Sequence, residues 1–273
     1  EIIAMAARGL RYKDKVTLVT GGSKGIGRGC VEVFVRNGST VVFCSRGESE
    51  GKKLEEEMNA NGPGQAFFVQ YDMAKEEDCK NLVEKTVKMY GRIDCLINNA
   101  GTHPPHKPID QFSGDDLREL LNVNLVSYFL TSKYALPHLR KTQGNIVNIS
   151  SVVNTLGQQY ATTYVSTKGG ISAFTRGLAI DEAKYGVRVN TISPGNIWTP
   201  LWDHMAKTAD NPNEEIERGK NSQLLGRYGT AEECGLACLF LAADATFCTG
   251  IDLNLTGGAE LNYGVKNPVA LGK

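Results

Sequence analysis

A glycine-rich segment near the start of the chain constrains the fold most. Residues 16–27 read VTLVTGGSKGIG, an apolar β-type run, a tight turn and the start of a helical pattern. Glycines let the backbone approach a ligand closely, and a helix N-terminus attracts negative charge. In a first strand–helix unit this pattern predicts a dinucleotide pyrophosphate site, and a ligand-free glycine turn is the alternative. The residues expected at this site are Gly21, Ser23, Lys24, Gly25, Ile26 and Gly27.

Strand and helix patterns then alternate along most of the chain. Apolar runs such as VVFC and IVNIS are typical of parallel strands buried on both faces. The expected strands are 16–20, 40–44, 66–70, 93–98, 145–150, 188–193 and 250–255, and the expected helices include 26–37, 50–59, 76–90 and 115–139. This order predicts an α/β fold with a doubly wound, parallel, seven-stranded Rossmann-type sheet in a single domain.

The remaining segments are divided by composition. We expect residues 1–11 to be an N-terminal extension, in part foreign to the natural protein because Met5 resembles a natural start. The catalytic domain is predicted over 12–260, and 261–273 form a C-terminal tail. Residues 195–222 are rich in Asn, Pro and charge, so we expect an irregular, mobile lid there.

Charge and cysteine usage exclude several function classes. Lys and Arg total 30, as do Asp and Glu, so no net field attracts nucleic acid. The longest apolar stretch is too short to span a membrane. Seven dispersed cysteines indicate reduced thiols and favour the cytoplasm. The four histidines have no metal-ligand spacing, so we expect no metal.

The end of the second strand bears on cofactor choice. An acidic residue there would bind the adenosine ribose of NAD, but this chain has Ser45 and Arg46. Arg46 and Lys24 could pair with a 2′-phosphate, and one such pair at ~4 Å is worth roughly 4 kcal/mol at a dielectric constant near 20. The sequence therefore favours NADP, with NAD as the alternative and two solvated cations as a third interpretation. Asp72 is placed to meet the adenine ring or to cap a helix.

Tyr164 and Lys168 are four residues apart in YVSTK, so a helix places them on one face. A nearby cation lowers the pKa of a phenol from about 10, which would make Tyr164 a general acid/base. Such a pair alone is usually ordinary surface. Here Ser151, the NNAG run of 98–101 and the SPG run of 193–195 all fall at the carboxyl ends of expected strands, where open α/β sheets bind ligands.

Together, TGGSKGIG, NNAG, Ser151, YVSTK and SPG resemble the classical short-chain dehydrogenase/reductase family over residues 12 to 260. The resemblance implies a catalytic tetrad in which Tyr164 exchanges the substrate proton. Ser151 would bind the substrate oxygen, Lys168 would tune Tyr164, and Asn124 would hold a water. Taken singly, Asn124 could instead bond backbone and Ser151 could be an ordinary cap. The resemblance also implies further cofactor contacts at Asn99, Gly101, Pro194, Gly195, Ile197 and Thr199.

The resemblance places His103, Gln158 and Trp202 around the substrate, where they would provide hydrogen bonds and an apolar wall. Turn formation and lid packing are the alternatives for His103 and Trp202. The expected activity is hydride transfer between a nicotinamide cofactor and a small secondary alcohol or ketone, most closely a 17β-hydroxysteroid or a sugar such as L-fucose. A 3-oxoacyl-thioester reductase and a non-catalytic cofactor-binding scaffold are the rival hypotheses. The family resemblance also implies a homo-oligomer, a dimer or a tetramer.

Overall fold

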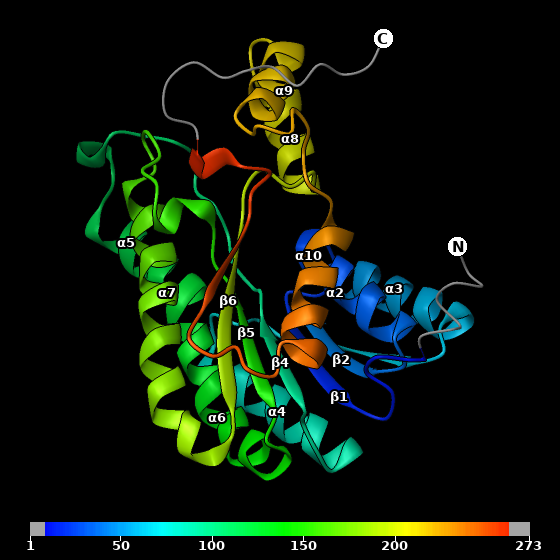
Figure 1. The fold of residues 1–273 in the computed structure, drawn as a ribbon. Coiled ribbons are helices and arrows are strands. Elements are labelled where there is room, and N and C mark those ends of the chain that lie inside the picture. Colours follow the sequence, from blue (N-terminus) through cyan, green and yellow to red (C-terminus); the bar gives the residue numbers. More distant parts are fainter. Residues whose placement is uncertain (1–8, 262–273) are drawn as a thin grey trace.

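The computed structural model describes residues 9–261, in which seven parallel strands form one sheet (Figure 1). Their order is β3-β2-β1-β4-β5-β6-β7, so the winding direction reverses between β1 and β4. The expected doubly wound sheet is confirmed. The strands are β1 (Val16–Thr20), β2 (Thr40–Ser45), β3 (Gln65–Gln70), β4 (Cys95–Asn98), β5 (Asn145–Ile149), β6 (Arg188–Pro194) and β7 (Asp252–Leu255).

Helices cover both faces of the sheet (Figure 1). Successive residues of β1 serve different cores: Val19 packs with the helices α2, α3 and α10, whereas Leu18 packs with α4, α6 and α7. Burial on both faces explains why the strands are apolar almost throughout. The helices are α2 (Gly25–Arg36), α3 (Glu48–Asn61), α4 (Glu76–Tyr90), α5 (Gly114–Leu121), α6 (Ser127–Thr142), α7 (Thr162–Glu182), α8 (Pro200–Thr208), α9 (Pro212–Asn221) and α10 (Ala231–Leu239).

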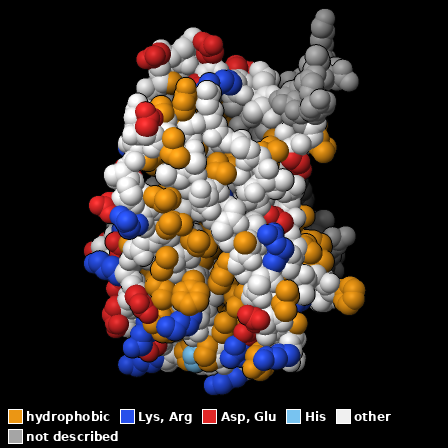
Figure 2. All heavy atoms as spheres, turned by 90° about the vertical axis from the view of Figure 1, so that its left-hand side faces the viewer, with side chains coloured by type: hydrophobic (Ala, Val, Ile, Leu, Met, Phe, Trp, Pro, Cys, Tyr) orange, Lys and Arg blue, Asp and Glu red, His pale blue; other side chains and the backbone are white. Residues whose placement is uncertain are grey.

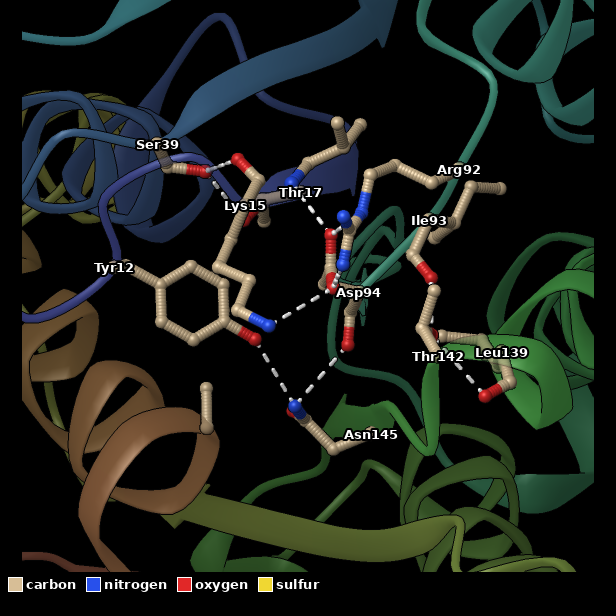
Figure 3. A network of polar contacts seen from close by, with 12 residues as sticks. Tyr12, Lys15, Thr17, Ser39, Arg92, Ile93, Asp94, Leu139, Thr142 and Asn145 are labelled. Carbon is tan, nitrogen blue, oxygen red and sulfur yellow. Dashed lines mark hydrogen bonds and ion pairs between the residues drawn. The ribbon is translucent and has the colours of Figure 1, made fainter.

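A buried carboxylate fastens the amino-terminal edge of the sheet (Figure 3). Asp94 accepts hydrogen bonds from the backbone of Val16 at 2.9 Å and from Arg92 at 2.7 and 2.9 Å. Lys15 lies 3.4 Å from the same carboxylate, and Asn145 donates to the Asp94 carbonyl. Because the charge is paired and hydrogen-bonded, its burial is tolerated. This cluster aligns β1, β4 and β5 and leaves their opposite ends free for a ligand.

Two sequence predictions about helices are wrong. The single helix expected over 115–139 is interrupted by a π-helical turn at Asn122–Val126. The segment expected to be irregular, 195–222, contains α8 and α9. Each begins with a proline at its first position behind a capping residue, Thr199 or Asn211. These prolines and polar residues are helix-start signals that resemble loop composition.

Most of the expected N-terminal extension and C-terminal tail lies outside residues 9–261. Within those residues, no helix is long and apolar enough to cross a membrane.

Helices α2 and α10 pack closely because glycines lie at their contact. A Cβ on Gly29 would overlap the carbonyl oxygen of Ala231. Gly29→Ala should therefore lower the free energy of unfolding by about 1–3 kcal/mol, as overpacking does. Urea denaturation measures this. Gly177→Ala in α7 is the control, because its Cβ would meet nothing within 4 Å. It should be neutral or stabilising, and equal losses in the two variants would contradict this packing.

Candidate active site

The glycine turn after β1 leaves room for a phosphate. Gly21 and Gly25 have φ of +66° and +54°, in the left-handed region that favours glycine. At Gly27 there is no space for a side chain, because an added Cβ would overlap the Gly21 carbonyl. Within residues 9–261, the N-cap residue Lys24 makes no side-chain capping bond to α2, so the first N–H groups of the helix can bind an anion. Ser23 is buried in the turn, and Ile26 lines the adjoining cavity.

The start of the NNAG run holds this turn in place. The Asn99 amide donates to the carbonyls of Thr20 and Gly21, both at 3.0 Å. The backbone N–H groups of Asn99 and Ala100 donate to the Thr20 hydroxyl at 2.9 and 3.0 Å. Asn99, predicted as a cofactor contact, thus supports the turn through its amide. Gly101 lies beside Asn124, whose side-chain oxygen a Cβ on Gly101 would approach to 3.3 Å.

The end of β2 differs from the sequence expectation. The sequence shows no acidic residue at the end of the second strand, but Glu50 in the first turn of α3 brings a carboxylate to the glycine turn by forming an ion pair with Lys24 at 2.6 Å. The Ser45 hydroxyl donates to the Gly47 carbonyl. Arg46 is exposed, and only its carbonyl, which accepts from Gln70, has a recorded hydrogen bond within residues 9–261. The missed charge comes from Glu50, five positions beyond the end of β2.

Asp72 does not cap a helix. Its carboxylate accepts from the backbone N–H of Ala74 at 3.1 Å, inside the turn after β3. The N-cap of α4 is Lys75, three residues later, which makes no side-chain capping bond. The adenine contact stays a prediction.

Tyr164 and Lys168 lie one turn apart on α7, beside the end of β5. The Lys168 ammonium donates to the Ile149 carbonyl at 2.9 Å, and its nitrogen lies 5.6 Å from the centre of the Tyr164 ring. Ser151 follows two residues after Ile149. Its hydroxyl bonds that of Tyr164 and also accepts from the Val153 N–H at 3.4 Å, so the alternative capping role is present as well.

The ionisation of this pair differs from the sequence prediction. Burial raises the pKa of Tyr164 to about 12, although the hydrogen bond from Ser151 opposes the shift. Burial lowers the pKa of Lys168 to about 8. The expected lowering of the tyrosine pKa by the lysine is therefore wrong in this structure. Desolvation disfavours both charged forms, and the ammonium is directed to a backbone carbonyl.

Asn124 sits in the π-helical turn and is fully buried. Its side chain accepts from the Thr102 N–H at 2.9 Å and donates to the Thr102 carbonyl at 3.0 Å and to the Thr167 hydroxyl at 3.2 Å. The alternative that it bonds backbone is therefore observed. These contacts tie the loop after β4 to α7. A π-bulge, which often marks functional sites, is not recognisable from helical periodicity.

A cavity of about 530 Å³ opens in front of Tyr164 and Ser151. The structure brings all three predicted substrate residues to its wall: His103, Gln158 and Trp202. The His103 ring packs on Tyr164 with centroids 4.1 Å apart. Gln158 lies between two imidazoles, 3.4 Å from His103 and 3.4 Å from His106. The sequence reasoning missed His106, although HPPH places two histidines in one short loop.

The predicted contacts at the end of β6 and just after it line the same cavity: Pro194, Gly195, Ile197 and Thr199. Thr199 also caps α8 by accepting from Trp202, and Ile197 forms a β-bridge with Gly229. Further lining residues were not predicted because α9 was expected to be irregular: Glu215, Arg218, Gly219 and Ser222. Glycine turn, uncapped helix N-terminus and cavity therefore adjoin one another at the point where the winding of the sheet reverses.

Comparison with known proteins agrees with this arrangement. A family model described as short chain dehydrogenase matches residues 15–210. The chain belongs to the short-chain dehydrogenase family. The L-fucose dehydrogenase of Bos taurus is 49% identical over 260 residues, covering 95% of this chain and 94% of that protein. The L-fucose dehydrogenase of Rattus norvegicus is 50% identical over 262 residues, covering 96% and 95%.

A solved structure, levodione reductase, superposes with a TM-score of 0.88 at 27% identity, covering 92% of this chain and all of that one. Family membership confirms the predicted class of activity: the chain is a nicotinamide-dependent oxidoreductase acting on CH–OH groups.

The buried ammonium of Lys168 should reduce stability. A pKa lowered from 10.5 to about 8 corresponds to roughly 3 kcal/mol at pH 7. The unpaired Ile149 carbonyl would offset part of that gain, so Lys168→Met should raise the free energy of unfolding by about 1–2 kcal/mol at pH 7. The gain should disappear as pH rises from 8 to 10.5, where the wild-type amine becomes neutral in both states.

Urea denaturation at pH 7 and pH 10 measures this difference. Lys53→Met, at an exposed position on α3, is the control and should change little at either pH. A Lys168→Met variant that is equally destabilised at both pH values would contradict the assignment of a costly buried charge.

Proposed function

We propose that this chain interconverts a sugar hydroxyl and the corresponding carbonyl, with L-fucose as the test substrate. The observation that supports this most is the cavity itself, where Tyr164 and Ser151 adjoin a wall carrying His103, His106 and Gln158. Hydroxyl groups need such donors and acceptors when they leave water. The names of the relatives, which are 49–50% identical over nearly the full chain, favour the same substrate.

Four side chains have distinct roles in the proposed reaction. Tyr164 holds the proton that the substrate oxygen gains on reduction or gives up on oxidation. Ser151 bonds that same oxygen and stabilises its developing charge. Lys168 fixes α7 against β5, while Asn124 fixes the loop after β4. When bound over the glycine turn, the nicotinamide cofactor supplies the acceptor or donor of the hydride.

The way in which the rate of each direction varies with pH depends on the Tyr164 proton. Because the pKa of Tyr164 is raised to about 12, its phenol is protonated at neutral pH and suits carbonyl reduction. Oxidation requires the deprotonated form, so the oxidation rate rises with pH.

Replacing Tyr164 tests the proposal. Tyr164→Phe should lower kcat for L-fucose oxidation by about 10²–10⁴-fold and abolish the rise in rate between pH 7 and pH 10. Absorbance of reduced nicotinamide measures both. The panel also includes estradiol and a 3-oxoacyl thioester. If the protein turns over the steroid or the thioester but not L-fucose, that compound replaces the sugar as the proposed substrate. Full activity in Tyr164→Phe would contradict the mechanism.

For the cofactor, we infer a preference for NADP. Arg46 is the first residue after β2, and Ser45 stands where an acidic residue would favour NAD. Glu50 opposes this preference because it pairs with Lys24 and brings a carboxylate to the glycine turn.

Three variants separate these contributions in fluorescence titrations. Arg46→Ala should weaken NADPH binding about tenfold and leave NADH binding unchanged, since one charge-assisted contact is lost. Glu50→Gln should release Lys24 and strengthen NADPH relative to NADH several-fold. Arg36→Ala, whose guanidinium pairs with Glu232, is the control. Tighter binding of NADH than of NADPH by the wild-type protein would refute the preference.

We infer that the chain also forms a homo-oligomer in a reducing compartment such as the cytoplasm. Apolar side chains gather on the α6–α7 face (Figure 2), where Phe129 is 50% and Ile180 79% exposed. Exposed apolar patches of this kind mark interfaces. All seven cysteines are free thiols. The mass in solution tests the oligomer.

A further inference from the structure

We propose that Glu215 and Arg218, both on α9, form a pair that recognises substrate hydroxyls remote from the reacting carbon and so selects a polyhydroxylated substrate. The inference rests on the proposed function, which it deepens by assigning substrate selection to a second part of the cavity. The reacting groups come from the segment just after β5 and from α7, whereas this pair comes from a different helix (Figure 1).

Both side chains line the cavity that contains Tyr164. Electrostatics place them near the HPPH loop as well. Burial lowers the pKa of the His106 imidazole, His103 and Arg218 also lower it, and Glu215 opposes them. The α9 pair and the HPPH loop therefore act on the same region of the cavity.

The bonding of this pair leaves capacity for a ligand. Arg218 donates to one oxygen of the Glu215 carboxylate, Oε2. Within residues 9–261, neither side chain makes another hydrogen bond. The Glu215 side chain is only 20% exposed, while that of Arg218 is 75% exposed. The carboxylate can thus accept from substrate hydroxyls through Oε1, and the guanidinium can donate to a sugar oxygen.

An apolar substrate would be penalised at this position. A steroid ring placed against Glu215 would remove water from a charged group and return no hydrogen bond. A sugar replaces that water with hydroxyl groups. Trp202, Leu156 and Met205 on the cavity wall can pack on the C–H surface of either molecule, so they discriminate less. The selection therefore depends on the charged pair.

The same helix offers a matched control. Glu217 forms an i,i+3 ion pair with Lys220, as Glu215 does with Arg218. Glu217 and Lys220 are not among the residues that line the cavity. Glu217→Gln therefore reproduces the loss of one carboxylate charge and one surface ion pair on α9 without changing the proposed recognition site.

The experiment compares a polyhydroxylated alcohol with a plain one. Oxidation of L-fucose and of cyclohexanol is measured with four proteins: the wild type, Glu215→Gln, Arg218→Met and Glu217→Gln. For Glu215→Gln and Arg218→Met we expect kcat/KM for L-fucose to fall roughly 10- to 100-fold, mainly through KM, because uniform binding is lost. Cyclohexanol turnover should change less than about twofold, and Glu217→Gln should resemble the wild type with both alcohols.

The inference would be overturned if Glu215→Gln and Arg218→Met left the ratio of kcat/KM for L-fucose to kcat/KM for cyclohexanol unchanged, either because neither value fell or because both fell equally. If the wild-type protein oxidises neither alcohol, the proposed function fails by itself. The inference is then decided by calorimetry of L-fucose with the same four proteins. Binding by the wild type that is lost in Glu215→Gln supports it, and equal or absent binding in both overturns it.

Discussion

The hydrogen bond from the Lys168 ammonium to the Ile149 carbonyl organises the active site. It joins the second turn of α7 to the end of β5. Tyr164 lies one turn before Lys168, and Ser151 lies two residues after Ile149, so a single contact brings both hydroxyls together. The charge is expensive to bury, as the lowered pKa of Lys168 shows. The remainder of the fold provides the stability that offsets this cost.

The two edges of the sheet are built differently. At the amino-terminal edge, Asp94 is surrounded by paired donors that fasten the strands. At the carboxyl edge, Thr20 and Asn99 use their hydrogen bonds to hold a glycine turn open. Polar side chains thus close one edge and keep space at the other. Ligand binding at the carboxyl edge follows from parallel strand topology.

The sequence predicted the sheet and most strand positions because apolar runs and glycine turns are local signals. It did not predict Glu50 beside Lys24, since that contact joins the glycine turn to α3, which follows only after α2 and β2. The helices α8 and α9 were not predicted, because Pro200 and Pro212 are typical of loops as well as of helix starts. The pKa of Tyr164 was predicted in the wrong direction, because spacing reveals a neighbouring cation but not how deeply both groups are buried.

With Tyr164 and Ser151 holding the substrate oxygen, a nicotinamide bound in the cavity would take up the hydrogen of the carbinol carbon directly. Oxidation of L-fucose deuterated at the reacting carbon tests this, followed by mass spectrometry of the reduced cofactor. We expect one deuterium on each reduced cofactor molecule and a primary isotope effect on kcat under saturating cofactor when hydride transfer limits the rate. Deuterium released to water while the cofactor remains unlabelled would contradict it.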